Sequence, residues 1–338
     1  MNRYEKQLLL PELTQGHQDL LKNTKLLMVG AGGLGAPALP YLAGAGIGHI
    51  TIVDDDVVDI SNLHRQTIFK TSDAGKNKAE LTAAYLKELN PQIKVTAVPQ
   101  KLNPGDDIDG FDIILDGTDN FESKQLLNEL SIRSKTPLVA ASVEGFNGTA
   151  AIFAGFDKNL PCYHCMFPEL PIDCKSCVGG GILGTVAGLA GLYQAHLTLC
   201  FLLDIGDVKP GTVLSLDFKT MRTQQLSLAK NLECTVCGKA QYGAKRQTSP
   251  AQVIPLIHPD ELDGHIVVDV RTFEEVATDP IDSALHMQLD TIPERYVELP
   301  TDRPIAFICR SNVRSRRAAE YLYARGYKNV CVLDALAA

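Results

Sequence analysis

Short apolar runs alternate with segments of helical spacing through the first half of the chain. The apolar runs predict buried strands at 25–30, 49–54, 93–98, 112–116 and 136–142. The segments between them predict helices at 34–45, 76–89 and 120–134. Because strands that alternate with helices form βαβ units, we expect an α/β fold with a parallel, doubly wound, Rossmann-like sheet.

The middle of the chain has a different pattern. Residues 155–181 are rich in Pro, Gly and Cys and show no periodicity, which suggests an active-site crossover loop. Residues 179–204 are nearly uncharged and long enough to span a bilayer. Gln194 and His196 interrupt this apolar run, and it stands alone, so we expect a buried core helix and no membrane span. Two strand-like runs, 212–218 and 222–228, then predict a hairpin.

A polar segment separates this part from a second α/β pattern. Beyond it, strands are predicted at 266–270, 304–308 and 329–333, and a helix at 314–325. We therefore expect a first domain over 1–240, a linker over 241–251 and a small second domain over 252–338.

Composition narrows the classes of protein and of partner. The 338 residues are enough for two domains, and 45% of them are hydrophobic. A net charge of −8 argues against nucleic acid or an anionic membrane as the main partner. The first residues are charged and lack the apolar core of a secretory signal, so we expect a cytoplasmic protein. For the nine cysteines, metal binding or thiol chemistry is then favoured over structural disulfides.

A glycine-rich turn follows the first predicted strand and opens the first helix after it. Gly30, Gly32, Gly33 and Gly35 fit the pattern G-x-G-x-x-G, in which bare backbone and a helix N-terminus bind phosphate. Asp54, at the end of the next strand, can hydrogen-bond a ribose hydroxyl. We therefore expect a nucleotide. The glycines alone favour NAD, and a tight turn without a ligand is the alternative.

Further charged residues change this balance. Arg65 and Lys78 can neutralise charge on an α-phosphate and on leaving pyrophosphate, as a nucleotidyl-transfer site requires and a hydride-transfer site does not. Asp119, just past a strand end, offers the oxygen ligands that Mg²⁺ prefers. Taken singly, Arg65 and Lys78 are better explained as solvated surface charges, so the interpretation depends on the set of residues together.

Together these motifs resemble those of the MoeB/ThiF adenylyltransferases, which are relatives of ubiquitin-activating enzymes. The resemblance covers about residues 1–240 and rests on G-x-G-G-L-G, a strand ending in D-x-D, S-N-L-x-R-Q, a later lysine and T-D-N. It implies that Asp54 holds the ribose of ATP and that Asp119 coordinates Mg²⁺. It also implies that the ATP phosphates are contacted by Asn62, Arg65 and Lys78.

The same resemblance implies partners. They are a second copy of the chain and a ubiquitin-like sulfur-carrier protein that ends in Gly-Gly. The carrier's terminal carboxylate would attack the α-phosphate to give an acyl-adenylate and pyrophosphate. In the family, an arginine of an N-terminal R-Y-x-R-Q motif reaches the partner subunit's ATP. Lys6 takes that place here, and lysine keeps the charge but loses the bidentate fork.

Two C-x-x-C pairs suggest a closed tetrahedral Zn²⁺ site, namely Cys162/Cys165 and Cys234/Cys237. Residue spacing alone does not exclude a third pair, Cys174/Cys177, as zinc ligands. The alternative to a zinc site is that these cysteines are thiols without a metal. The family resemblance favours the outer two pairs.

Cys177 also has a separate interpretation. It precedes a glycine-rich run and a predicted helix start, where a thiol becomes a better nucleophile. Its spacing resembles that of the family's mobile-loop cysteine, which can form a thioester or an acyl-disulfide with the carrier. An inert loop cysteine is the alternative.

A last cysteine lies in the loop between a predicted strand and the C-terminal helix. Backbone N–H groups of such a loop stabilise a thiolate or persulfide at Cys309, and Arg314 adds positive charge. With Asp269-Val270-Arg271 and Glu274-Glu275, this loop resembles that of a rhodanese domain over about 252–338. The resemblance implies that Cys309 carries sulfur from a donor such as a cysteine desulfurase or thiosulfate. Asn312 stands where glycine is usual and the chain ends early, so weak activity or an inactive docking module is the alternative.

Three functions remain open on these grounds. Carrier adenylation coupled to sulfur transfer uses the motifs of both expected domains. An NAD-dependent oxidoreductase would leave Arg65, Lys78, Asp119 and the cysteine pairs without a role. A non-catalytic scaffold for a ubiquitin-like protein would not depend on Asp119.

Overall fold

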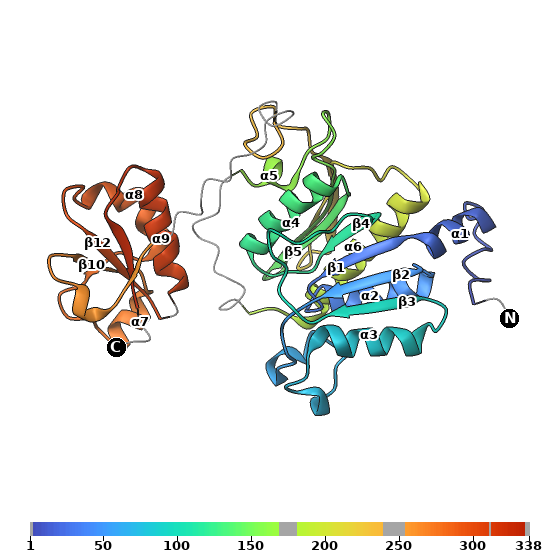
Figure 1. The fold of residues 1–338 in the computed structure, drawn as a ribbon, viewed down its shortest axis with the longest axis horizontal. Coiled ribbons are helices and arrows are strands. Elements are labelled where there is room, and N and C mark those ends of the chain that lie inside the picture. Colours follow the sequence, from blue (N-terminus) through green and yellow to red (C-terminus); the bar gives the residue numbers. More distant parts are fainter. Residues whose placement is uncertain (1–2, 169–180, 239–253, 311, 335–338) are drawn as a thin grey trace. The chain divides into compact units, whose positions relative to one another are not determined.

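The computed structural model describes residues 3–168, 181–238, 254–310 and 312–334, which fall into two compact units (Figure 1). The predicted linker at 241–251 and the cysteines Cys174 and Cys177 lie outside the described residues.

The first unit is built on an eight-stranded sheet of order β3-β2-β1-β4-β5-β6-β7-β8. Its strands are β1 Lys25–Val29, β2 His49–Val53, β3 Lys94–Val98, β4 Ile113–Asp116, β5 Leu138–Glu144, β6 Asn147–Phe153, β7 Thr212–Asp217 and β8 Arg222–Ser227. The five strands β1 to β5 pair in parallel, which confirms the predicted Rossmann-like part of the sheet. Strands β6 to β8 extend the sheet antiparallel, and β7 with β8 is the predicted hairpin.

Helices cover both faces of this sheet (Figure 1). They are α1 Gln15–Asn23, α2 Gly35–Ala45, α3 Lys78–Leu89, α4 Phe121–Ser134, α5 Tyr163–Met166 and α6 Gly184–Leu203. On β1, Leu26 and Met28 pack in one core cluster with residues of α2 and α3, whereas Leu27 and Val29 pack in another with residues of α4. The alternating direction of side chains on a strand therefore produces the doubly wound arrangement.

The long apolar run forms α6. By length and composition alone this helix could cross a membrane, which is weak evidence for a span, and over half of its apolar window is buried inside the protein. Gln194 is fully buried and donates hydrogen bonds to the backbone oxygens of Asp116 and Val139, at 2.8 and 2.9 Å. The helix therefore packs on strands β4 and β5 of the sheet, as a core helix does.

The second unit is a smaller parallel sheet of order β11-β10-β12-β13-β9. Its strands are β9 Leu256–Ile257, β10 Ile266–Asp269, β11 Leu285–His286, β12 Ile305–Ile308 and β13 Val330–Leu333, and its helices are α7 Phe273–Thr278, α8 Ile292–Arg295 and α9 Val313–Ala324. The side chains of Val268, Phe307 and Val332 are fully buried in its core. Strand β12 leads through a short loop into α9, and this loop carries Cys309.

Candidate active sites

The glycine-rich turn lies between β1 and α2, at the carboxyl ends of the parallel strands. Gly30 has a φ of +90°, and a Cβ there would lie 2.7 Å from the backbone of Gly117, at the end of β4. A Cβ on Gly35 would lie 2.2 Å from the carbonyl oxygen of Gly30. Only glycine allows this close approach, so the turn presents bare backbone at the start of a helix, where phosphate binds.

Asp54 follows β2 and lies beside this turn. Its Oδ2 accepts a hydrogen bond from the backbone N–H of Ala31 at 2.7 Å, and its Oδ1 accepts one from Asp56 at 2.9 Å. Burial raises the pKa of Asp54 above its usual value, although the two backbone hydrogen bonds oppose the shift. The predicted ribose-binding carboxyl is thus fixed next to the glycine loop.

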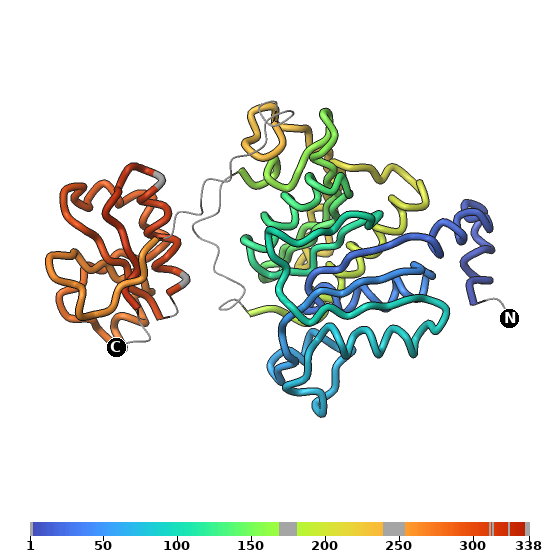
Figure 2. The backbone as a smooth tube through the Cα atoms, viewed as in Figure 1, coloured from blue at the N-terminus to red at the C-terminus, as the bar shows by residue number. Residues whose placement is uncertain are grey.

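Arg65 belongs to a segment that winds between β2 and α3 (Figure 2). The segment contains a short 3-10 helix, Ile60–Asn62, and Arg65 Nη1 donates to the carbonyl oxygen of Ser61 at 3.2 Å. The Cδ atom of Arg65 lies 3.5 Å from the position of a Cβ on Gly33. The structure therefore places the Arg65 side chain beside the glycine loop, and the carbonyl oxygen of Asn62 accepts a hydrogen bond from the backbone N–H of Arg65 at 3.0 Å.

Gly184, the first residue of α6, packs against the same segment. A Cβ on Gly184 would lie 2.1 Å from the carbonyl oxygen of His64. The N-terminus of α6 thus contacts the backbone that positions Arg65.

Lys78 is the first residue of α3 and is almost completely buried. Its Nζ lies 2.8 Å from Oδ2 of Asp56, and its side chain is only 6% exposed. The alternative of a solvated surface charge is therefore wrong for Lys78. Asn77 caps the helix by accepting a hydrogen bond from Glu80 N, which explains why α3 begins at Lys78 and not at the predicted residue 76.

Asp119 is exposed in the loop between β4 and α4, and a buried ion pair holds that loop. Asp116 accepts hydrogen bonds from the backbone N–H and hydroxyl of Thr118, at 2.9 and 2.6 Å. Its other oxygen lies 2.7 Å from Nζ of Lys124, and both side chains are buried. The side-chain oxygen of Asn120 accepts a hydrogen bond from the backbone N–H of Ser123 and so caps the N-terminus of α4. These contacts hold the backbone on both sides of Asp119. Breaking the buried pair of Asp116 and Lys124 by removing one partner would typically cost about 3–5 kcal/mol of stability.

Sequence reasoning missed the pair of Asp116 and Lys124. The available signal was a carboxylate at the end of an all-apolar strand and a lysine on the helix that follows. Their spacing alone does not show that they meet.

Lys6 is not brought to the glycine loop of its own chain. The segment around it packs at the other end of α2 and α3, where Arg3 donates to the carbonyl oxygen of Leu89 at 3.0 Å and Gln7 to that of Ala45 at 3.3 Å. The glycine loop lies at the N-terminus of α2, which is about 16 Å long at 1.5 Å per residue. The segment that carries the exposed Lys6 is therefore separated from this chain's own glycine loop by about the length of α2.

The two outer cysteine pairs come together in one cluster. The Sγ atom of Cys162 lies 3.9 Å from that of Cys165 and 3.8 Å from that of Cys234, and Cys165 lies 3.4 Å from Cys237. Four sulfurs at about 2.3 Å from a central Zn²⁺ would be about 3.8 Å apart, so the donor set fits a tetrahedral site. Hydrogen bonds with Cys165 and Cys237, together with burial, raise the pKa of the Cys162 thiol, so metal binding here would release protons.

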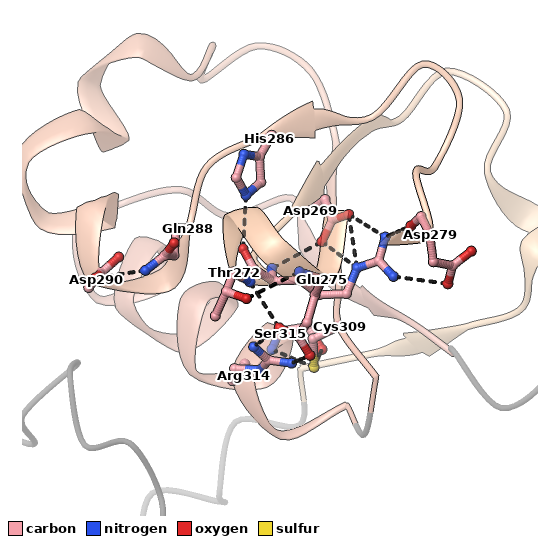
Figure 3. Close-up of polar contacts among 11 residues, drawn as sticks. Asp269, Thr272, Glu275, Asp279, His286, Gln288, Asp290, Cys309, Arg314 and Ser315 are labelled. Atoms are coloured by element: carbon pink, nitrogen blue, oxygen red, sulfur yellow. Dashed lines mark hydrogen bonds and ion pairs between the residues drawn. The ribbon is translucent and has the colours of Figure 1, made fainter. Parts of the chain in front are cut away.

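Cys309 lies at the end of β12 and is almost completely buried (Figure 3). Its Sγ accepts a hydrogen bond from the backbone N–H of Ser315 at 3.3 Å and lies 3.4 Å from the Ser315 hydroxyl. Asn312 has the left-handed φ of 59°, and its side chain donates to Asp334 at 2.9 Å. Asparagine therefore adopts here a left-handed backbone conformation that glycine reaches freely, and the loop leads into α9 with the Ser315 N–H directed at the sulfur.

Arg314 does not act as a free positive charge beside Cys309. Its Nη1 and Nη2 atoms lie 2.6 and 2.8 Å from the two carboxylate oxygens of Glu275. The hydrogen bonds from Arg314 lower the pKa of Glu275 to about 2, so this carboxylate stays ionised near neutral pH. The sequence motif contains Glu274 and Glu275, but it does not show which of them pairs with the arginine.

Comparisons with known proteins agree with this geometry. Residues 4–236 match the ThiF family, and residues 249–335 match the rhodanese-like domain. The sulfur carrier protein adenylyltransferase of Thermus thermophilus is 35% identical over 70% of this chain and 91% of its own. The adenylyltransferase and sulfurtransferase UBA4 of Saccharomyces cerevisiae is 35% identical over 88% of this chain and 71% of its own.

The E. coli MccB structure with ATP has a related fold, with a TM-score of 0.61 and 22% identity over 70% of this chain and 74% of MccB. At that identity the likeness shows the fold alone. The relatives favour nucleotidyl transfer over the NAD alternative, which the glycines by themselves leave open.

Proposed function

This chain belongs to the ThiF family and carries a rhodanese-like domain, and from that premise we propose that it adenylates the C-terminal glycine of a ubiquitin-like sulfur-carrier protein and then supplies it with sulfur. The observation that carries the proposal is the convergence of Asp54, Arg65, Lys78 and the Asp119 loop around the glycine turn. The relative named a sulfur carrier protein adenylyltransferase supports the choice of acceptor.

The adenylation step needs positioning and charge, and it needs no general base. The carrier's terminal carboxylate is already ionised, so its oxygen attacks the α-phosphate of ATP and pyrophosphate leaves with the electron pair of the broken P–O bond. Arg65 and Lys78 stabilise the charge that builds on the phosphates, and Asp54 orients the ribose. Asp119 would hold Mg²⁺, which supplies further charge stabilisation.

Sulfur transfer is assigned to Cys309 in this proposal. A persulfide on Cys309 attacks the carbonyl carbon of the acyl-adenylate, AMP leaves with the electron pair of the C–O bond, and a carrier acyl-disulfide to Cys309 forms. A reducing thiol then attacks the Cys309 sulfur, the carrier thiocarboxylate leaves with the electron pair of the S–S bond, and Cys309 ends in a disulfide with that thiol. The donors from Ser315 and the rest of the loop stabilise the persulfide anion. Cys177, predicted as a further nucleophile, lies outside the described residues.

We also propose that two copies of the chain form a homodimer in which Lys6 contacts the partner subunit's ATP. The position of the N-terminal segment, at the far end of α2 from its own glycine loop, supports this. Sedimentation analysis of the purified chain tests it, and a monomer throughout the micromolar range would rule it out.

The function is tested by offering the chain ATP, Mg²⁺ and a panel of purified carriers that end in Gly-Gly. We expect ATP–pyrophosphate exchange that depends on one carrier, with a carrier acyl-AMP adduct seen by mass spectrometry. Fluorescence of NADH is measured in parallel. Tight NADH binding without any exchange would favour the oxidoreductase and contradict the proposal.

We propose Zn²⁺ as the ion of the four-cysteine cluster, with a structural role. Purified chain is expected to contain one zinc per chain by elemental mass spectrometry, and Cys162→Ser to lose it and unfold at a lower temperature, because metal binding contributes directly to folding. Cys200→Ser is the matched control, since Cys200 is a buried thiol outside the cluster. Zinc retained at full occupancy in Cys162→Ser would contradict this assignment.

A further inference from the structure

Two guanidinium groups of the second unit, those of Arg314 and Arg271, are paired with carboxylates, and Figure 3 shows the pair of Arg314 with Glu275. Both terminal nitrogens of Arg314 bind Glu275, and neither side chain is more than 29% exposed. Arg271 is buried against Asp269, at 2.7 Å, and also lies 3.3 Å from Asp279. Arg310 is exposed beside Cys309, so water and salt screen its charge. Cys309 therefore receives hydrogen bonds from Ser315, and Arg314, whose cation interacts with the Cys309 thiol, has its larger interaction with Glu275.

This arrangement has consequences for the sulfur donor. Thiosulfate is a dianion, and it must exchange its hydration for positive charge when it enters a site. A persulfide on a small thiol has less charge at its reacting end and needs less compensation. Glu275 occupies the two Arg314 nitrogens that would otherwise form a bidentate pair with an oxyanion.

We propose that Glu275 is a specificity-determining residue, which by pairing with Arg314 disfavours free dianionic sulfur donors and favours sulfane sulfur carried on a thiol. The inference rests on the proposed function, since it needs Cys309 to accept sulfur. In the favoured step the Cys309 thiolate attacks the outer sulfur of R–S–SH. The S–S bond breaks, its electron pair leaves with R–S⁻, and Cys309–S–SH forms.

The test compares two donors in the full-length chain, thiosulfate and cysteine persulfide, with cyanide as the acceptor. Glu275→Gln is expected to raise kcat/KM for thiosulfate by about tenfold, mainly through KM, because it frees a bidentate cation. The value for cysteine persulfide should change by less than about threefold, since that donor depends less on the charge. Glutamine keeps an oxygen that can accept the hydrogen bond from Thr272 N, so the start of α7 is preserved.

Glu274→Gln is the matched control. Glu274 is exposed in the same first turn of α7, and its replacement makes the same change in net charge. The thiosulfate gain should be absent in Glu274→Gln, and the double variant Glu275→Gln/Arg314→Gln should not exceed Arg314→Gln alone. The gain should also shrink as ionic strength rises.

Suppose that both donors load sulfur on Cys309 and that Glu275→Gln leaves the ratio of their two kcat/KM values unchanged. This result would overturn the specificity role of Glu275 and leave the proposed function intact. An equal gain in Glu274→Gln would also overturn it, because the effect would then be one of net charge. Failure of both donors to place sulfur on Cys309 would overturn the specificity role and the proposed sulfur transfer together.

Discussion

Asp119→Ala is expected to lower carrier-dependent ATP–pyrophosphate exchange by about 10²–10³-fold, the usual cost of losing one group that stabilises charge in a transition state. Asp119 is exposed, and no salt bridge is formed by its side chain among the described residues, so the fold should not depend on it. The loop is held by Asp116, Thr118 and Lys124, which remain. Exchange of labelled pyrophosphate into ATP, measured across a range of Mg²⁺ concentrations, gives the result.

Asp109→Ala is the control for this prediction, because Asp109 is an exposed aspartate in the loop before β4, near the opposite edge of the sheet. It should keep full exchange activity. Thermal unfolding should give the same midpoint for both variants and the unchanged chain. Normal exchange in Asp119→Ala would remove the support for adenylation at this site and revive the scaffold alternative.

Cys309→Ser is expected to abolish thiocarboxylate formation on the carrier, a loss of about 10³-fold or more, while ATP–pyrophosphate exchange stays unchanged. Serine cannot carry a sulfane sulfur, and its hydroxyl is a far weaker nucleophile than a thiolate. Cys309 belongs to the second unit, whereas the residues of the glycine loop belong to the first. Mass spectrometry of the carrier after reaction with a sulfur donor detects the exchange of one oxygen for sulfur.

Cys331→Ser provides the matched control, since Cys331 is a buried thiol on β13 of the same unit that donates to the carbonyl oxygen of Ile305. It should leave thiocarboxylate formation intact. A thiocarboxylate product made by Cys309→Ser would show that sulfur reaches the carrier by another route, and Cys309 would lose its assigned role.

Hydrophobic pattern was sufficient for β1 and β4, because these strands are buried on both faces and form nearly continuous apolar runs. It was insufficient for β6, which begins Asn147-Gly148-Thr149 and has the composition of a turn. Strand β6 forms because Gly145 and Phe146 reverse the chain onto β5. Strands β9 and β11 have two residues each, too few for any periodicity to be visible.

The site residues could be proposed from motifs, but their partners could not. The pairing of Lys124 with Asp116, and of Arg314 with Glu275, depends on how helices pack against strand ends, which residue spacing does not determine. Residue spacing likewise left a third cysteine pair open, and the structure brings the four thiols of the outer two pairs together, as the family resemblance favoured. The structure is therefore needed to show which charged or thiol side chains contact one another, because the motifs identify the residues but not their partners.

The tight contact between Gly184 and His64 has a mechanical consequence. Backbone meets backbone there without space for a single extra carbon, so any side chain at position 184 would push the first turn of α6 away from the segment that carries Arg65.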